Sequence, residues 1–125
     1  MIKQLGGDID WDLAYEAVVS DAEEELSMWD YSGRGGLGSW KTLGFIPVHD
    51  NDTEGHGLKT RSVSRTVEFA YNDFCIAQMA EEMEYLEDAE KYFGRAGNWR
   101  NLFKEDQNSS INGIDTPFVG FLQPR

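Results

Sequence analysis

Hydrophobic residues at three- and four-residue steps predict an amphipathic helix near the start of the chain. Asp8 or Asp10 can cap this helix, which should run to about Leu26. Its apolar stripe consists of Trp11, Tyr15, Val18, Ala22 and Leu26. The far side, with Glu16, Ser20 and Glu23, is expected to face water. Several acidic residues crowd the C-terminal end and oppose the helix dipole, so that end needs solvent or a basic neighbour.

The stretch from Arg61 to Ala80 predicts a second helix, with hydroxyl groups available to cap its start. Its apolar residues form two roughly opposite sides. One side consists of Val67, Ala70, Tyr71 and Phe74, and the other of Phe69, Ile76 and Ala80. A helix that is apolar nearly all round is normally buried on every side. Cys75 lies within it, and we expect a buried structural thiol.

Polar side chains interrupt this apolar helix between its two sides. Glu68, Asn72 and Asp73 lie there, and buried carboxylates are costly unless they are paired or hydrogen-bonded. The helix therefore holds a structural polar network or contributes to a functional site. Glu68 and Asp73 are the carboxylates in the most apolar setting. They lie about 140° apart around the helix, so they should face different neighbours.

The segments between the helices predict loops and one short helical turn. Ser27 to Gly38 is glycine-rich, which permits positive φ angles and close backbone approach, and Arg34 within it could anchor a carboxylate such as Asp30. Trp40 to Leu43 predicts a helical turn that ends at Gly44, and the following FIPV is expected to be extended.

A further helix is expected to fold back on the central one as an α-hairpin. Leu86, Ala89, Phe93 and Ala96 form one face of it, after a turn near Met83 to Glu87. From Lys104 the polar run EDQNSSINGIDTP predicts a loop. The expected fold class is therefore all-α with long loops.

Composition limits the possible partners and compartments. The 125 residues make one domain at most, and 23 acidic against 11 basic residues give a net charge of −12. Such a charge repels phosphate groups, so neither nucleic acid nor an anionic membrane surface is an expected partner. No stretch is long and apolar enough to cross a membrane. The start, MIKQLGGDID, lacks a signal-peptide core, so we expect a cytosolic chain or a piece of a longer product, and the compartment stays undetermined.

The acidic loop His49 to Leu58 has part of the pattern of a metal site. Asp50, Asp52 and Glu54 imitate the first half of a calcium-binding EF-hand loop. The second half departs from that pattern, because Arg61 stands where a bidentate glutamate is required. We therefore expect a solvated loop and no metal site in this chain.

Several motifs, in the same order along the chain, resemble glycoside hydrolase family 92. They are IDWDLAYEAVVSDAE, GRGGL, LGFIPV, SVSRTVEFAYNDFCIAQMA, YFGRAGNWRNLF and GFLQPR. Family members are calcium-dependent exo-α-mannosidases, and the likeness is greatest to the fungal ones. It extends from about Asp8 to Arg125.

The resemblance implies that residues 1–125 form a fragment of the helical catalytic domain of such an enzyme, like part of an (α/α)6 barrel. It also implies that mannose-containing glycans are the substrates of the full-length enzymes, which are often secreted. The general acid, the base and the calcium ligands of the family lie beyond GFLQPR, so the isolated chain should be inactive and have the rest of the domain as its partner. In the matched SVSRTVEFAYND run, Arg65, Glu68 and Asp73 are expected to shape or support the sugar pocket.

Two other functions stay open at the level of sequence. The run from Ala77 to Phe103 has the small and aromatic alternation of paired helices in tetratricopeptide-type binding modules, although arrays of that type need about three repeats. The chain could also be a non-catalytic carbohydrate binder with Trp29 and Trp40 as stacking platforms. Trp29, in the glycine-rich loop, is the tryptophan most suited to contact a sugar ring.

Overall fold

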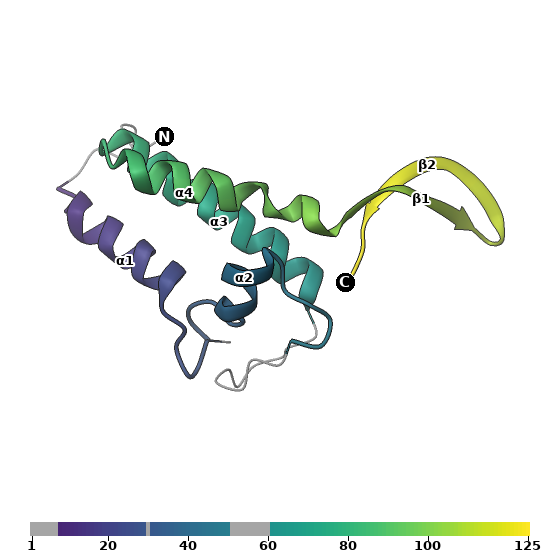
Figure 1. The fold of residues 1–125 in the computed structure, drawn as a ribbon, viewed down its shortest axis with the longest axis horizontal. Helices are drawn as coiled ribbons and strands as arrows, with labels where there is room; N and C mark the ends of the chain where they lie inside the picture. Colours follow the sequence, from purple (N-terminus) through teal and green to yellow (C-terminus); the bar gives the residue numbers. More distant parts are fainter. Residues whose placement is uncertain (1–7, 30, 51–60) are drawn as a thin grey trace.

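The computed structural model of the chain describes residues 8–29, 31–50 and 61–125 (Figure 1). Its elements, in chain order, are the helices α1 (Trp11–Glu23), α2 (Leu37–Leu43), α3 (Ser62–Glu82) and α4 (Leu86–Ala96), the 3₁₀ helix η2 (Gly97–Leu102), and the strands β1 (Phe103–Ile111) and β2 (Ile114–Leu122). None of the helices in these ranges is long and apolar enough to span a bilayer.

Helix α3 is the axis of the structure. It forms an antiparallel hairpin with α4, as predicted, and the turn between them places Glu84 at a φ of 63°. The Tyr85 amide closes this turn by donating to the Ala80 carbonyl at 2.9 Å. Helices α1 and α2 lie along different parts of α3 (Figure 1).

Two hydrophobic clusters share α3. The first joins α1, α3 and α4 and consists of Tyr15, Ala22, Ile76, Ala77, Ala80, Ala89 and Tyr92. The second joins α2 and the segment after it to the N-terminal half of α3 and consists of Leu37, Trp40, Ile46, Phe69 and Ala70. The apolar residues of α3 therefore fix the positions of the other three helices.

Helix α1 follows the predicted pattern at its start and departs from it at its end. Asp10 caps the helix by accepting the Leu13 amide at 3.0 Å. The helix stops at Glu23, so Leu26 lies outside it and half exposed. Glu23 was expected to face water, but it is partly enclosed by basic side chains of α2 and α4. Those basic neighbours offset the unfavourable dipole interaction noted from the sequence.

Three expectations for α3 were wrong. No side chain caps its first turn: the Ser64 hydroxyl instead donates to the Arg61 carbonyl at 3.2 Å. The Thr66 hydroxyl accepts the Ile46 amide at 2.9 Å, which ties the extended segment to the helix. Cys75 is exposed rather than buried. Among the described residues, the other apolar side of α3 is only partly covered: Ala70 is buried, while Val67, Tyr71 and Phe74 stay exposed.

The expected all-α fold class is also wrong, because the described residues hold four α-helices and a two-stranded antiparallel sheet. The polar run after Lys104 forms a β-hairpin and not a loop. Asn112 and Gly113 both have positive φ angles, 54° and 79°, which is the backbone geometry of a two-residue hairpin turn. This turn pairs Ile111 with Ile114 and sets the register that ends with Phe103 opposite Leu122.

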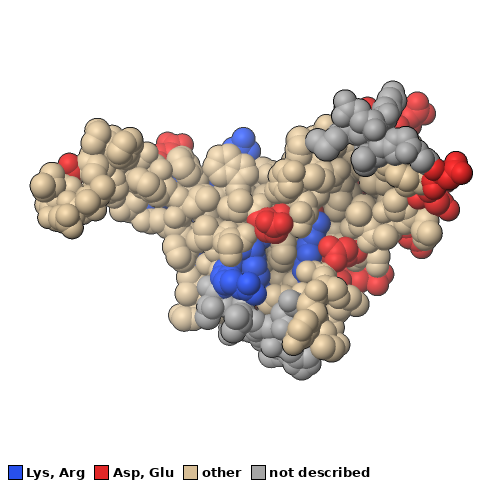
Figure 2. Space-filling view, turned by 180° about the vertical axis from the view of Figure 1, so that it is seen from behind, with Lys and Arg blue, Asp and Glu red and all other residues tan. Residues whose placement is uncertain are grey.

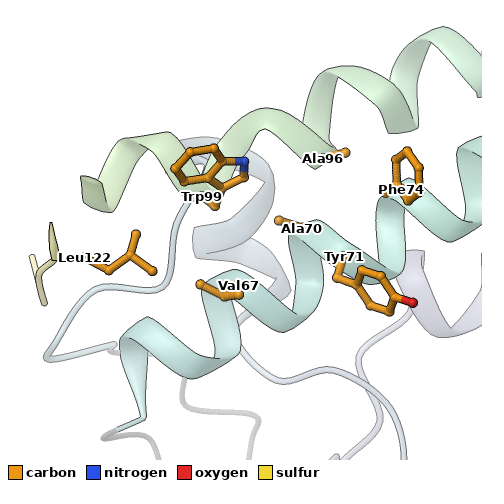
Figure 3. A pocket seen from close by; sticks show the side chains of 7 residues that line it. All are labelled: Val67, Ala70, Tyr71, Phe74, Ala96, Trp99 and Leu122. Atoms are coloured by element: carbon orange, nitrogen blue, oxygen red, sulfur yellow. The ribbon is translucent and has the colours of Figure 1, made fainter. Parts of the chain in front are cut away.

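The hairpin projects from the end of η2, away from the helices (Figure 1). Its base is tied down at two points: the Gln123 amide donates to the Leu102 carbonyl at 2.9 Å, and the Val48 amide donates to the Arg125 carbonyl at 2.8 Å. These two hydrogen bonds hold the base of the hairpin, where Leu122 lines a pocket together with residues of α3, α4 and η2 (Figure 3). The distal part of the hairpin stays exposed.

Candidate functional site

A pocket of about 300 Å³ lies at the N-terminal end of α3. It is lined by Trp29, Gly33, Gly35, Arg61, Ser64, Arg65, Glu68 and Phe69. Arg61, Arg65 and Glu68 stand at i, i+4 and i+7, so they share one face of α3. The glycine-rich loop after α1 forms the facing wall. Three of the four residues predicted to shape a site, Trp29, Arg65 and Glu68, therefore meet in one pocket.

Arg65 is a fixed cation in this pocket. Its side chain is almost fully buried, at 7% exposure. One guanidinium nitrogen donates to the Gly35 carbonyl at 3.3 Å and lies 3.7 Å from the Asp50 carboxylate. The guanidinium also lies 5.2 Å from the centre of the Trp29 ring, within the range of a cation–π contact. These contacts hold the charge in place before any ligand arrives.

Trp29 supports Arg65 and is itself buried, at 6% exposure. Gly35 packs against its indole so closely that a Cβ atom at this position would overlap the ring. The indole Nε1 is buried and has no hydrogen-bond partner among the described residues. Trp40, the other tryptophan considered for sugar stacking, is 1% exposed. Neither indole presents an open ring face to solvent in this arrangement.

Glu68 lies on the exposed side of the pocket, so its expected apolar setting was wrong. Its carboxylate makes no hydrogen bond or ion pair with another residue in the described ranges. The pocket therefore combines a buried, fixed guanidinium with an accessible carboxylate.

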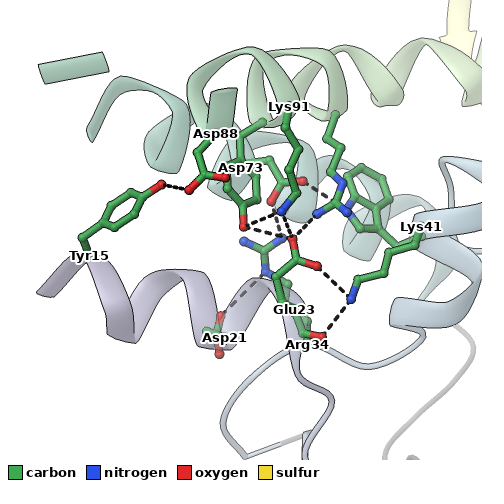
Figure 4. Close-up of polar contacts among 11 residues, drawn as sticks. Tyr15, Asp21, Glu23, Arg34, Lys41, Asp73, Asp88 and Lys91 are labelled. Carbon is green, nitrogen blue, oxygen red and sulfur yellow. Dashed lines mark hydrogen bonds and ion pairs between the residues drawn. The ribbon is translucent and has the colours of Figure 1, made fainter. Parts of the chain in front are cut away.

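Asp73 lies apart from this pocket, in a buried polar network (Figure 4). Its carboxylate accepts a hydrogen bond from the Arg34 guanidinium at 2.5 Å and one from the Trp40 indole at 3.1 Å. Arg34, 2% exposed, also lies 3.7 Å from Asp21. The prediction that Arg34 anchors a carboxylate is confirmed, with Asp73 as the partner, while Asp30 lies outside the described residues. Glu68 and Asp73 face different neighbours, as their angular separation predicted.

A second network surrounds Glu23 at the end of α1 (Figure 4). Its carboxylate pairs with Lys41 and Lys91, each at 2.8 Å, and with Arg95 at 2.6 Å, and it accepts the Tyr92 hydroxyl at 2.9 Å. Partial burial alone would raise the pKa of Glu23, but the hydrogen bonds from these four groups outweigh it and hold the pKa far below its ordinary value. The network joins α1, α2 and α4 and does not border the pocket.

No group of three or more metal-ligating side chains is found among residues 8–29, 31–50 and 61–125. Asp50, the first acidic residue of the EF-hand-like loop, accepts the Ser39 hydroxyl at 2.7 Å and lies beside Arg65. The rest of that loop lies outside the described residues. The described side chains therefore do not fit a calcium ion.

Two residues in or beside the pocket were not predicted from the sequence. Arg61 lines the pocket, and Asp50 lies behind it as the carboxylate nearest Arg65. The i, i+4 spacing from Arg61 to Arg65 was a usable signal, since it places both side chains on the face that carries Glu68. The position of Asp50 had no such signal, because it depends on how the loop after α2 returns to α3.

Comparison with known proteins identifies the family. Residues 1–125 match the glycosyl hydrolase family 92 catalytic domain. The chain is 56% identical over 124 residues to a protein of Arthroderma benhamiae named as an uncharacterized secreted glycosidase, and the match covers 99% of this chain and 16% of that protein. The family GH92 inverting mannosidase BT2199 from Bacteroides thetaiotaomicron is similar in structure, with a TM-score of 0.68 and 27% identity over 79% of this chain and 12% of that one. The chain spans under a fifth of the length of each, and it belongs to glycosyl hydrolase family 92.

Proposed function

We propose that this chain is one segment of the catalytic domain of a family 92 exo-α-mannosidase, and that the pocket at the start of α3 faces the sugar. The family match over the whole chain supports the reaction class. The solved relative is an inverting mannosidase, which supports mannose-containing glycans as the substrates of the full-length protein. The fungal relative is named as secreted, which supports secretion of the parent enzyme.

The observation that carries the pocket assignment is the pairing of Arg65 and Glu68 on one face of α3. Sugar hydroxyls both donate and accept hydrogen bonds, so a guanidinium and a carboxylate together can satisfy them. Arg65 is already held by Gly35 and the Trp29 ring, so little side-chain entropy would be lost when a sugar binds. Trp29 acts in this proposal as the support of Arg65.

Asp73 has a positioning role in the proposal. It binds Arg34 of the glycine-rich loop and Trp40 of α2, and it belongs to α3. The network therefore fixes the loop that carries Gly33 and Gly35 against the helix that carries Arg65 and Glu68. A sugar would not contact Asp73 directly.

Hydrolysis with inversion needs an acid and a base whose carboxyl groups are roughly 6.5–9.5 Å apart. Glu68 is the one carboxylate among the described residues that line the pocket, and Asp73 is committed to Arg34 and Trp40. The described residues of the pocket thus supply binding groups but no acid–base pair. In this proposal other parts of a family 92 enzyme supply the acid, the base and the calcium ion, and the isolated chain releases no mannose.

The proposal is tested by grafting residues 1–125 into the Arthroderma glycosidase in place of the matching segment and measuring mannose release in calcium buffer. Arg65→Met and Glu68→Gln should each lower kcat/KM by roughly 10- to 100-fold, the equivalent of losing one charge-assisted hydrogen bond. Glu81→Gln, an exposed glutamate further along α3, is the matched control and should leave kcat/KM unchanged.

Two results would count against the proposal. Unchanged kinetics in both pocket variants would show that the pocket does not face the sugar. Mannose release by the isolated chain, lost in Glu68→Gln, would show that the acid–base machinery lies within these 125 residues.

A further inference from the structure

Strand β1 carries a sequence motif that the Arg65 pocket does not use. Asn108-Ser109-Ser110 is an Asn-X-Ser/Thr sequon, with a middle residue other than proline. Such a sequence accepts an N-linked glycan when the chain enters the secretory pathway and the asparagine lies at the surface. A motif of this length also arises by chance, so the position of these residues in the fold has to decide whether they can act as an acceptor.

The two residues that define the sequon lie on one exposed face of β1. Asn108 and Ser110 are exposed, while Gln107 and Ser109 are half-buried. This is the ordinary alternation of a strand, in which residues two positions apart share a face. It holds although the pairing register shifts between Asn108 and Ser110. An enzyme that approaches this face would meet the asparagine and the hydroxyl residue together.

The side chains of this face are also free of other contacts. Across residues 8–29, 31–50 and 61–125, neither the Asn108 carboxamide nor the Ser110 hydroxyl makes a hydrogen bond. Ser109 between them differs, since its hydroxyl contacts that of Thr116 and donates to the Phe118 carbonyl at 3.3 Å. The fold therefore commits the middle residue to the hairpin and leaves the acceptor and the neighbouring hydroxyl available.

Strand β1 is suited to remain exposed in a longer protein. Every residue from Lys104 to Ser110 is polar, and charged and amide side chains on both faces of a strand are costly to bury. The hairpin projects away from the helices (Figure 1), and among the described residues β1 pairs with β2 alone. A glycan on β1 would therefore extend into solvent without displacing a packed element.

We propose that Asn108 is an N-glycosylation site of the parent enzyme. The sugar donor is an oligosaccharide joined through a diphosphate to a lipid carrier. A bond forms between Asn108 Nδ2 and C1 of the first sugar, and the bond between C1 and the diphosphate oxygen breaks. The lipid diphosphate and one amide proton are released. Ser110 supplies the hydroxyl, two residues after the acceptor, that the transferring enzyme requires.

This inference rests on secretion of the parent enzyme, which is part of the proposed function and is supported by the fungal relative that is named as secreted. It does not depend on the role of Arg65 or Glu68, because β1 contributes no residue to their pocket.

The test maps glycans on the graft of residues 1–125 in the Arthroderma glycosidase, secreted from a yeast. Trypsin gives a peptide that begins at residue 105 and contains Asn108. Peptide N-glycosidase F, used in water labelled with heavy oxygen, converts each glycosylated asparagine to a labelled aspartate, which mass spectrometry locates. Label is expected at position 108 in most copies of this peptide. Asn112 is an internal control in the same peptide, since Ile114 stands where the sequon needs a hydroxyl.

The two neighbouring serines supply matched variants. Ser110→Ala removes the sequon and should abolish the label at position 108, whereas Ser109→Ala keeps the sequon and should retain the label. Ser110→Thr also keeps the sequon and should retain the label, which separates recognition of the hydroxyl from an effect on folding. The other sequon, Asn51-Asp52-Thr53, lies outside the described residues and in a different tryptic peptide, so it does not affect this measurement.

An unlabelled position 108 in protein recovered from the culture medium would overturn the proposal. Label that persists in Ser110→Ala would also overturn it, because the label would then not depend on the sequon. Should the graft stay inside the cells, the same peptide from their membrane fraction gives the same measurement, since the glycan is attached as the chain enters the secretory pathway. Mannose release is not measured, so failure of this inference is distinct from failure of the proposed function.

Discussion

At the scale of single residues, the Arg34–Asp73 pair shows how a buried charge constrains the fold. Both side chains are nearly inaccessible to water, and Asp73 is held from two directions, by Arg34 and by Trp40. Burying two charges costs several kcal/mol per ion, and their attraction offsets this cost only when the geometry is good and other hydrogen bonds are satisfied. Removing either side chain alone should therefore destabilise the fold, mainly because it leaves the charge of the other buried and unpaired.

Replacing Arg34 with methionine should lower the free energy of unfolding by about 3–5 kcal/mol, because it leaves the Asp73 charge buried and unpaired. The measurement is urea unfolding followed by tryptophan fluorescence. Adding Asp73→Asn to Arg34→Met removes that charge and keeps an acceptor for the Trp40 indole, so the double variant should lose less stability than Arg34→Met alone. A larger loss in the double variant would contradict this account.

Close packing at Gly35 leads to a second prediction. Gly35→Ala places a methyl group where the Trp29 indole lies, so the ring must move and Arg65 loses its support. We expect a loss of about 1–3 kcal/mol in the urea titration, as for other overpacked sites. Gly38→Ala is the matched control, since nothing lies within 4 Å of a Cβ there and alanine favours the helix. Equal stability of the two variants would show that the contact is not tight.

At the scale of elements, Glu23 of α1 pairs with basic side chains of α2 and α4. The stability of these contacts between the three helices therefore depends on the ionisation of Glu23, and so on pH. Its pKa is held well below the ordinary value of 4.5, because hydrogen bonds from Lys41, Lys91 and Arg95 outweigh the effect of burial. A carboxylate with a depressed folded-state pKa adds stability above its unfolded pKa, and this contribution is lost as the pH falls. The contacts of α1 with α2 and α4 should therefore weaken in acid.

We expect the free energy of unfolding to fall as the pH is lowered below about 4.5, with a shallower slope in Glu23→Gln. The check is a series of urea titrations at stepwise lower pH. Glu24→Gln is the control, because Glu24 is exposed and adjacent, and it should keep the wild-type slope. Identical slopes for Glu23→Gln and the wild type would exclude this network as the source of acid sensitivity.

Periodicity predicted the helices well because their packing repeats every three to four residues. Helix α4 runs over Leu86–Ala96, where its apolar face was expected, and α3 extends only slightly beyond its predicted end. The β-hairpin was missed because its strands alternate weakly and are largely exposed, so the polar composition predicted a loop. The Asn112-Gly113 pair was the local signal that could have identified the turn, but the prediction from the sequence did not use it.

The candidate site was predictable only in part, because only some of its contacts follow from the helical repeat. Residue spacing predicts which side chains share a helical face, and it places Arg65 and Glu68 on the same face of α3. The contacts of Trp29 with Gly35 and Arg65 depend on how a glycine-rich loop crosses α3. No periodic pattern specifies that crossing. The choice of Asp73 as the partner of Arg34 likewise depends on tertiary structure.

At the scale of the whole molecule, negative charge is unevenly placed. On the face shown in Figure 2, acidic side chains gather mainly at the end away from the hairpin. With a net charge of −12, these groups repel one another, and repulsion of this kind destabilises the compact state. Screening by salt should relieve it, while buried pairs such as Arg34–Asp73 are screened much less.

The urea midpoint should therefore rise when NaCl is raised from about 0.01 M to about 0.15 M, since the screening length falls from about 30 Å to about 8 Å. A variant with Glu81→Lys and Glu90→Lys, both at exposed positions, carries less net charge and should respond less to salt. A midpoint that falls with added salt would mean that favourable surface ion pairs outweigh the repulsion.

The central position of α3 has a consequence for how the chain assembles. Helices α3 and α4 are joined by the short turn 83–85, so they can meet as soon as both exist. Helix α1 is attached through contacts such as the Tyr15 hydroxyl to Asp88 at 2.7 Å, which closes a loop of 73 residues and costs more chain entropy. We therefore expect the helical hairpin to form early, and α1 to dock after it and to detach before it.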